Sequence, residues 1–279
     1  MKSRLNLLMA AVFGFAAALN PAPVLAQAAT TMDFGPDIEE ADHHRMNLRV
    51  AEAEAAYQRA HAKSPDDPTV LVRYSSFKRT LGEYDEAIRL LRRAEESIAN
   101  GGVLIGGPEY LQLTLGITYY RTGIDYERAA AIFREFIEEY PDAAAYHSHL
   151  AFSEIGRGNE AEALRNLQLA EQLFGDRLNS YRGATLALGY AKLGRSDDVR
   201  RLFGRLQEME SVSQAAWSAA YIALGDYDQA RQHFETAITN PESISGATNV
   251  LYFVADNPFR DPALEDARFQ ELFNRLRGK

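Results

Sequence analysis

The stretch GEYDEAIRLLRRA at residues 82–94 returns in altered form as GDYDQARQHFETA at residues 225–237. Each begins with a glycine, has an alanine five residues later, a bulky apolar residue four further on, and a small residue three after that. Related stretches begin at Gly123, Gly158 and Gly194, so that successive glycines lie 31 to 41 residues apart. Self-similarity at this period indicates a stack of repeated units, each packing on its neighbours.

The spacing inside each unit predicts two helices joined at the glycine. Apolar residues at intervals of three and four lie on one face of a helix. A glycine between two such stretches suits a helix end, because it adopts the left-handed backbone without a steric penalty. In the second unit we expect helices at residues 69–80 and 85–97, with a turn at Leu81-Gly82. The stretch from Ser97 to Pro108 contains two glycine pairs and predicts a surface loop.

The third unit carries the fullest pattern, with Leu115-Gly116 and Tyr119, then Ala129 and Phe133, and a closing Pro141. It resembles the L-G-x-x-Y, A-x-x-x-F and terminal proline of the tetratricopeptide repeat family. The resemblance implies an all-α fold, an α-solenoid of about six antiparallel helix pairs with a C-terminal capping helix. The implied segments are a repeat array at 37–242, with units near 37–67, 68–107, 108–143, 144–177, 178–210 and 211–242, and a helical C-terminal cap at 243–279.

The first unit departs from the family pattern. Residues 37–63 contain no glycine or proline, which predicts either one long helix or a degenerate helix pair. Glu39 and Glu40 precede His43 and His44 by four residues, a spacing at which carboxylate and imidazole can share a cation. No H-E-x-x-H motif is present, so we interpret this helix as solvated and expect no metal site.

The amino-terminal residues resemble a cleavable secretory signal. Lys2 and Arg4 precede an uncharged stretch from Leu5 to Leu19, and small residues follow. Those 15 residues would span about 22 Å as a helix, against about 30 Å of bilayer hydrocarbon, so an uncleaved anchor is disfavoured. We expect a signal peptide at 1–26, cleaved after Ala26 or Ala28, and a disordered tether at 27–36. The protein is then exported, periplasmic or secreted, without stable membrane insertion after cleavage.

Composition excludes several kinds of site and partner. The chain has no cysteine, so it forms no disulfide, thiolate metal site or lipoprotein anchor. Its net charge of −9 argues against a nucleic-acid surface. Residues 189–196 have the glycine spacing of a phosphate-binding loop, but Arg195 stands in place of the required lysine and no strand precedes it. We expect no cofactor and no enzymatic activity.

The family resemblance also implies where a partner binds. In the family, set positions of the first helix of each pair line a concave groove. Carried onto this chain, they include Arg79 in the second unit. The candidate groove residues are Tyr110, Leu113, Ile117, Tyr120, Arg121, His149, Phe152, Tyr181, Leu188 and Lys192.

This apolar, aromatic set with few cations suits an amphipathic helix or an extended apolar peptide. We therefore predict a non-enzymatic protein–protein interaction scaffold in the bacterial periplasm or envelope. The alternative is a carbohydrate-binding component of an exopolysaccharide system, in which Tyr110, Tyr120 and Tyr181 would stack on sugars. A further possibility is that the chain's own first helix or tail covers the groove, since an apolar patch is otherwise left in water.

Overall fold

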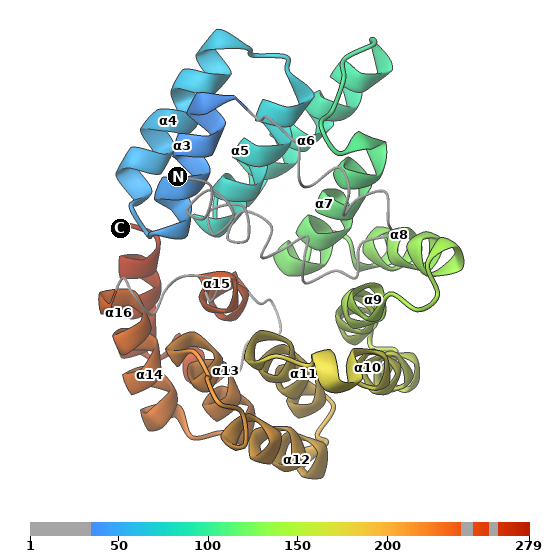
Figure 1. Cartoon of the computed structure of the whole chain (residues 1–279), viewed down its shortest axis with the longest axis vertical. Helices are drawn as coiled ribbons and strands as arrows, with labels where there is room; N and C mark the ends of the chain where they lie inside the picture. Colours follow the sequence, from blue (N-terminus) through green and yellow to red (C-terminus); the bar gives the residue numbers. More distant parts are fainter. Residues whose placement is uncertain (1–34, 241–247, 257–261) are drawn as a thin grey trace.

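The computed structural model describes residues 35–240, 248–256 and 262–279, and the regular elements in these ranges are all helical. The predicted signal peptide and most of the predicted tether lie outside the described residues. Twelve α-helices follow one another as six antiparallel pairs (Figure 1), which confirms the predicted all-α solenoid. The pairs are α3 (Pro36–Met46) with α4 (Val50–Lys63), α5 (Pro68–Thr80) with α6 (Tyr84–Ala99), α7 (Gly107–Thr122) with α8 (Tyr126–Glu139), α9 (Ala144–Arg157) with α10 (Glu160–Phe174), α11 (Ser180–Lys192) with α12 (Ser196–Gln207), and α13 (Gln214–Leu224) with α14 (Tyr227–Thr239).

Two further α-helices, α15 (Thr248–Asp256) and α16 (Ala267–Leu276), complete the described chain. Short 3-10 helices lie at Gly175–Arg177 and Pro262–Glu265. None of the helices in the described ranges is both long and apolar enough to cross a bilayer. The predicted surface loop lies between α6 and α7, where Val103 is 80% exposed.

From the second pair onward, the repeated glycines end the first helix of the pair. Gly123 follows α7 with φ of 73° and Gly225 follows α13 with φ of 81°, both in the left-handed region that favours glycine. Asp125, two residues after Gly123, accepts a hydrogen bond from the amide of Arg128, and Asp226, directly after Gly225, accepts one from the amide of Gln229. One short segment therefore ends one helix and begins the next.

The first unit is a helix pair and not one long helix. α3 and α4 are separated by Asn47–Arg49, where Leu48 has φ of 54°. Despite its polar sequence, α3 turns one carboxylate inward, since Asp42 is 2% exposed and accepts a hydrogen bond from the Tyr57 hydroxyl. Its oxygens also lie 3.5 Å from an Arg73 nitrogen and 3.4 Å from an Arg45 nitrogen.

Glycines inside helices permit close contact between helices, both within a pair and between neighbouring pairs. A Cβ on Gly116 would lie 2.9 Å from a ring carbon of Phe133, and one on Gly189 would lie 2.8 Å from a methyl carbon of Leu167. Real Cβ atoms essentially never approach so closely. Gly189 is thus a packing residue inside α11, and Gly194, with φ of 66°, is the turn that follows. This explains the glycine spacing that resembles a phosphate loop.

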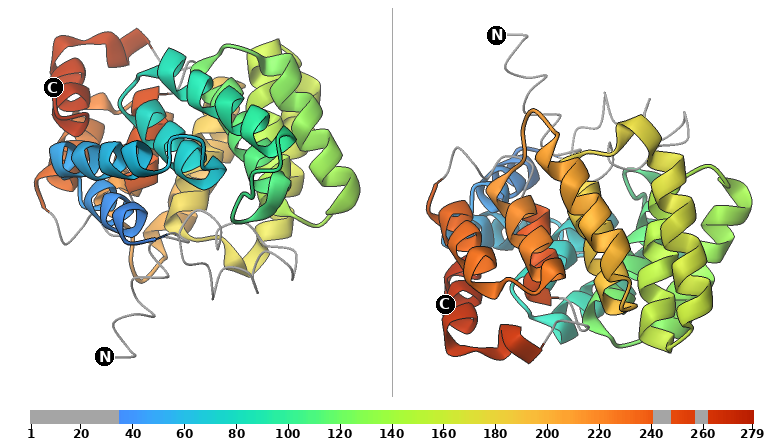
Figure 2. Two further views of the ribbon diagram at one scale, coloured as in Figure 1. Left: turned by 90° about the horizontal axis from the view of Figure 1, so that it is seen from above. Right: turned by 90° about the horizontal axis from the view of Figure 1, so that it is seen from below.

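The six pairs curve into a ring, and α16 closes it. α16 packs on α14, where Phe273 meets Phe234 with ring centroids 5.5 Å apart. Beyond α16, the Lys279 ammonium donates to the carbonyl of Leu81, 3.1 Å away, at the turn after α5. The last described residues therefore join the last pair to the first pairs (Figures 1 and 2).

Candidate functional site

The concave side of the ring already holds a helix. α15 lies at its centre in Figure 1 and contacts α5, α7 and α13, each the first helix of its pair. Its residues 251–256 are all buried, with exposed fractions of 4% or less. The sequence suggested that either the first helix or the tail could cover the groove. α15 belongs to the tail, so the tail occupies the groove. α16 packs on the last pair as a cap does, whereas α15 fills the groove.

Asp256, at the end of α15, forms a buried ion-pair network. An Arg121 nitrogen donates to one carboxylate oxygen at 2.8 Å, and an Arg277 nitrogen donates to the other at 3.0 Å. The carboxylate is fully buried, and the Arg121 side chain is 4% exposed. Burial raises the pKa of Asp256, while Arg121 and Arg277 oppose that rise. α15 is thus fixed by an electrostatic contact in addition to its apolar side chains.

A third guanidinium lies in this region and forms no ion pair with a carboxylate of the described residues. Arg79, near the end of α5, is 6% exposed. Its Nε and Nη1 atoms are buried and have no hydrogen-bond partner in the described part of the chain. Burial first, and then the charge of Arg121, lower the pKa of Arg79 to about 9. Asp256 therefore stands among three arginines, and among these four described side chains positive charge exceeds negative charge.

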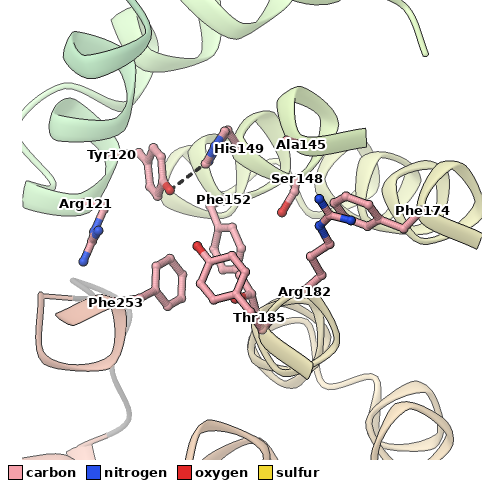
Figure 3. A pocket seen from close by; sticks show the side chains of 11 residues that line it. Tyr120, Arg121, Ala145, Ser148, His149, Phe152, Phe174, Arg182, Thr185 and Phe253 are labelled. Carbon is pink, nitrogen blue, oxygen red and sulfur yellow. Dashed lines mark hydrogen bonds between the residues drawn. The ribbon is translucent and has the colours of Figure 1, made fainter. Parts of the chain in front are cut away.

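A small pocket remains beside α15, between α7, α9 and α11 (Figure 3). Its volume is about 40 Å³, which has room for water-sized groups and not for a helix. The ring of Phe253 from α15 meets that of Phe152 edge-on, with centroids 5.0 Å apart. The lining residues are Tyr120, Arg121, Ala145, Ser148, His149, Phe152, Phe174, Tyr181, Arg182, Thr185 and Phe253.

Two titratable side chains in this pocket, His149 and Tyr120, are uncharged and hydrogen-bonded to each other. His149 Nδ1 and the Tyr120 hydroxyl lie 3.0 Å apart and form a hydrogen bond (Figure 3). Burial, together with the charges of Arg121 and Arg79, lowers the pKa of His149 to about 3. Burial also raises the pKa of Tyr120 well above its usual range. Both groups are therefore neutral at physiological pH, and the pocket is polar without being acidic or basic at this pair.

The structure separates the predicted groove residues into three groups. Five of them, Tyr120, Arg121, His149, Phe152 and Tyr181, line the pocket together. Leu113, Ile117 and Leu188 are buried, with exposed fractions of 6%, 2% and 4%. Tyr110 and Lys192 are half-buried, and the Arg73 guanidinium lies 5.9 Å from the centroid of the Tyr110 ring.

Sequence reasoning missed Asp256 and Phe253, which α15 contributes to the same surface. The available signal was a run of six apolar residues, 250–255, followed by a single acid. At the first helix, His44 Nε2 lies 3.6 Å from a Glu40 oxygen. Within the described ranges, no group of three or more histidine or acidic side chains is placed to hold a metal ion.

Comparisons with known proteins agree with the fold. Profiles of the tetratricopeptide repeat match residues 49–101, 110–143 and 218–242. A search of curated proteins found no match. Among solved structures, a tetratricopeptide repeat protein from Parabacteroides merdae is similar, with a TM-score of 0.55 and 17% identity over 78% of this chain and 82% of that one. At this identity the likeness shows the fold alone. The three matched segments therefore show that the chain contains tetratricopeptide repeats, and the solved structure has the same kind of fold.

Proposed function

We propose that this protein is a non-enzymatic protein–protein interaction scaffold of the bacterial envelope, which binds an apolar or amphipathic peptide segment on its concave face. Tetratricopeptide repeats are typical of protein-binding scaffolds, and three of them match here. A solenoid of this kind offers an extended concave surface for such a partner.

The observation that carries the proposal is the seating of α15. The concave face accommodates the nine-residue helix α15, of which residues 251–256 are buried. The side-chain carboxylate of Asp256, its last residue, pairs with Arg121. An apolar helix laid in a groove is a recurring mode of peptide recognition. α15 is therefore an internal example of the ligand chemistry that this face accepts.

The carbohydrate alternative has less support. Stacking on a sugar needs an open ring face, but Tyr120 is 3% exposed and its ring lies among those of Phe133, His149 and Phe152. The proposed sugar platform would then rest on Tyr110 and Tyr181, which are both half-buried.

Export is the second part of the proposal and rests on the charged, apolar and small-residue order of residues 1–26. Fractionation of cells that express the protein should place the wild-type chain in the periplasm or medium, shortened at its amino terminus. The paired substitution Leu7→Arg and Leu8→Arg interrupts the apolar stretch and should retain the chain in the cytoplasm. Equal distribution of the two proteins would contradict export by this segment.

Binding is tested by site-specific crosslinking in the native envelope. A photoreactive residue at Tyr181, which lines the pocket, should capture a protein that the same residue at Leu169, 37% exposed on α10, does not. A peptide from the captured segment should then bind the purified protein, and Tyr181→Ala should weaken that binding. Equal capture from both positions, or capture of a glycan and no protein, would contradict the proposal.

A further inference from the structure

We propose that α15 is a displaceable occupant of the concave face, and that the external partner is an apolar helix bearing two acidic side chains where α15 bears one. This inference rests on the proposed function and specifies the partner's chemistry. It follows from three properties of α15 and its surroundings.

The first property is an imbalance of charge. Asp256 faces Arg121, Arg277 and, further away, Arg79. Asp256 is the one carboxylate among the strongest electrostatic influences on Arg79, and the buried Nε and Nη1 of Arg79 have no hydrogen-bond partner within the described residues. A buried donor without a partner is costly, and more so when it is charged. A ligand with a second acid near Arg79 would be more complementary to this surface than α15 is.

The second property is incomplete filling. The pocket beside Phe253 remains open between α7, α9 and α11, with Ser148, His149 and Thr185 in its lining. Interiors of proteins are usually packed without such spaces. A partner helix with larger side chains at this position would make contacts that α15 does not make.

The third property is the short length of α15. It has nine residues, and a helix of this length is not stable by itself in water, so packing on α5, α7 and α13 holds it in place. Any external helix must compete with α15. The apparent affinity of the external helix equals its intrinsic affinity multiplied by the fraction of molecules in which the concave face is open. A change that weakens the docking of α15 should therefore strengthen the binding of a partner.

The experiment uses two labelled peptides and the purified full chain. One peptide has the sequence of residues 248–256, TNVLYFVAD, and the other carries an added glutamate at its end; both are acetylated and amidated. Asp256→Asn removes the charge that pairs with Arg121 and Arg277, while Glu271→Gln changes an exposed acid on α16 as the matched control. Circular dichroism and thermal unfolding establish that each variant is folded.

We expect Asp256→Asn to bind the two-acid peptide at least about tenfold more tightly than the wild type does, with Glu271→Gln equal to the wild type. In the Asp256→Asn background, the two-acid peptide should bind about tenfold more tightly than the one-acid peptide. Adding Arg79→Gln should abolish that preference, and adding Arg92→Gln, at an exposed arginine on α6, should not. In the wild type, saturating two-acid peptide should accelerate amide hydrogen exchange in α15.

The inference is overturned if binding is the same with and without Asp256, if the preference for two acids survives Arg79→Gln, or if α15 stays protected in the complex. These outcomes are separate from the crosslinking test. If the peptides fail while Tyr181 still captures a protein, the proposed function stands and the displacement of α15 is wrong. If the peptides bind as expected while Tyr181 captures nothing, the competition stands and the scaffold function is wrong.

Discussion

Replacing Arg121 with methionine tests whether the ion pair with Asp256 holds α15 in the concave face. Methionine keeps most of the length of the side chain and removes its charge. The Asp256 carboxylate is fully buried, and loss of Arg121 leaves it with the ion pair to Arg277 and the more distant charge of Arg79. Breaking a buried pair by removal of one partner costs about 3–5 kcal/mol. Because Arg277 and Arg79 remain, we expect the lower end of that range, about 3 kcal/mol.

Urea unfolding followed by circular dichroism gives the free energy of unfolding for each variant. Arg92→Met, at an exposed arginine, is the matched control and should change stability by less than about 0.5 kcal/mol. Hydrogen exchange provides a local measurement, in which the amides of α15 should lose protection before those of α9.

A double-mutant cycle shows whether the two residues act on each other. Arg121→Met and Asp256→Asn should together cost less than the sum of the single changes, with a difference of about 2 kcal/mol. The reason is that once either charge is absent, removal of the other no longer breaks the pair. Effects that add to within about 0.5 kcal/mol would refute the assigned contact.

Three further predictions concern pH and packing. His149→Asn should reduce the loss of stability on acidification by about 1.4 kcal/mol per pH unit between pH 6 and 4.5. The reason is that folding keeps His149 neutral, whereas the unfolded chain binds a proton at this residue below about pH 6.5. Equal slopes of unfolding free energy against pH, measured by urea titration of the two proteins, would contradict this. Gly189→Ala should lower the unfolding free energy by about 1–3 kcal/mol through the clash at α11, whereas Gly204→Ala, with open space around it, should raise it by up to about 1 kcal/mol. Burial raises the pKa of Asp42, but Arg73, Arg45 and Tyr57 outweigh burial, so the pKa is lowered overall. Asp42→Asn should therefore cost about 3 kcal/mol of unfolding free energy at pH 7 and progressively less below pH 4, where the carboxylate is protonated.

The controls for these predictions are measurements on the same variants. The histidine variant should match the wild type in slope above pH 7, where both states carry a neutral ring. A thermal shift of the same sign for both glycine variants would contradict the packing argument. A cost for Asp42→Asn that does not shrink in acid would show that shape, and not charge, explains the effect.

The repeat pattern predicted the fold because each unit encodes its own turn. Gly123 and Gly225 adopt the left-handed backbone that ends one helix just before the next begins. This requirement involves only a few neighbouring residues, so it can be recognised in the sequence. The concave residues followed from the same register, which is why five of them meet at the pocket.

The occupant of the groove was not predictable in the same way. Asp256 and Arg121 are 135 residues apart, and their contact exists only because six pairs curve far enough to enclose α15. In the sequence, Asp256 is an ordinary acid after an apolar run. The excess charge at Arg79 likewise depends on which arginines the curvature brings together.

Closure of the ring by α16 also restricts how the protein can change its length. Open repeat arrays gain or lose units with little disturbance, because each unit contacts only its neighbours. Here the Lys279 ammonium meets the Leu81 carbonyl, and the Arg277 guanidinium lies against Gly82. Insertion or deletion of one helix pair would carry these groups away from their partners and would also shift Asp256 relative to Arg121. The number of repeats is therefore fixed by the contacts of the tail, and duplication of a unit, the usual way in which such proteins diversify, would break this one open.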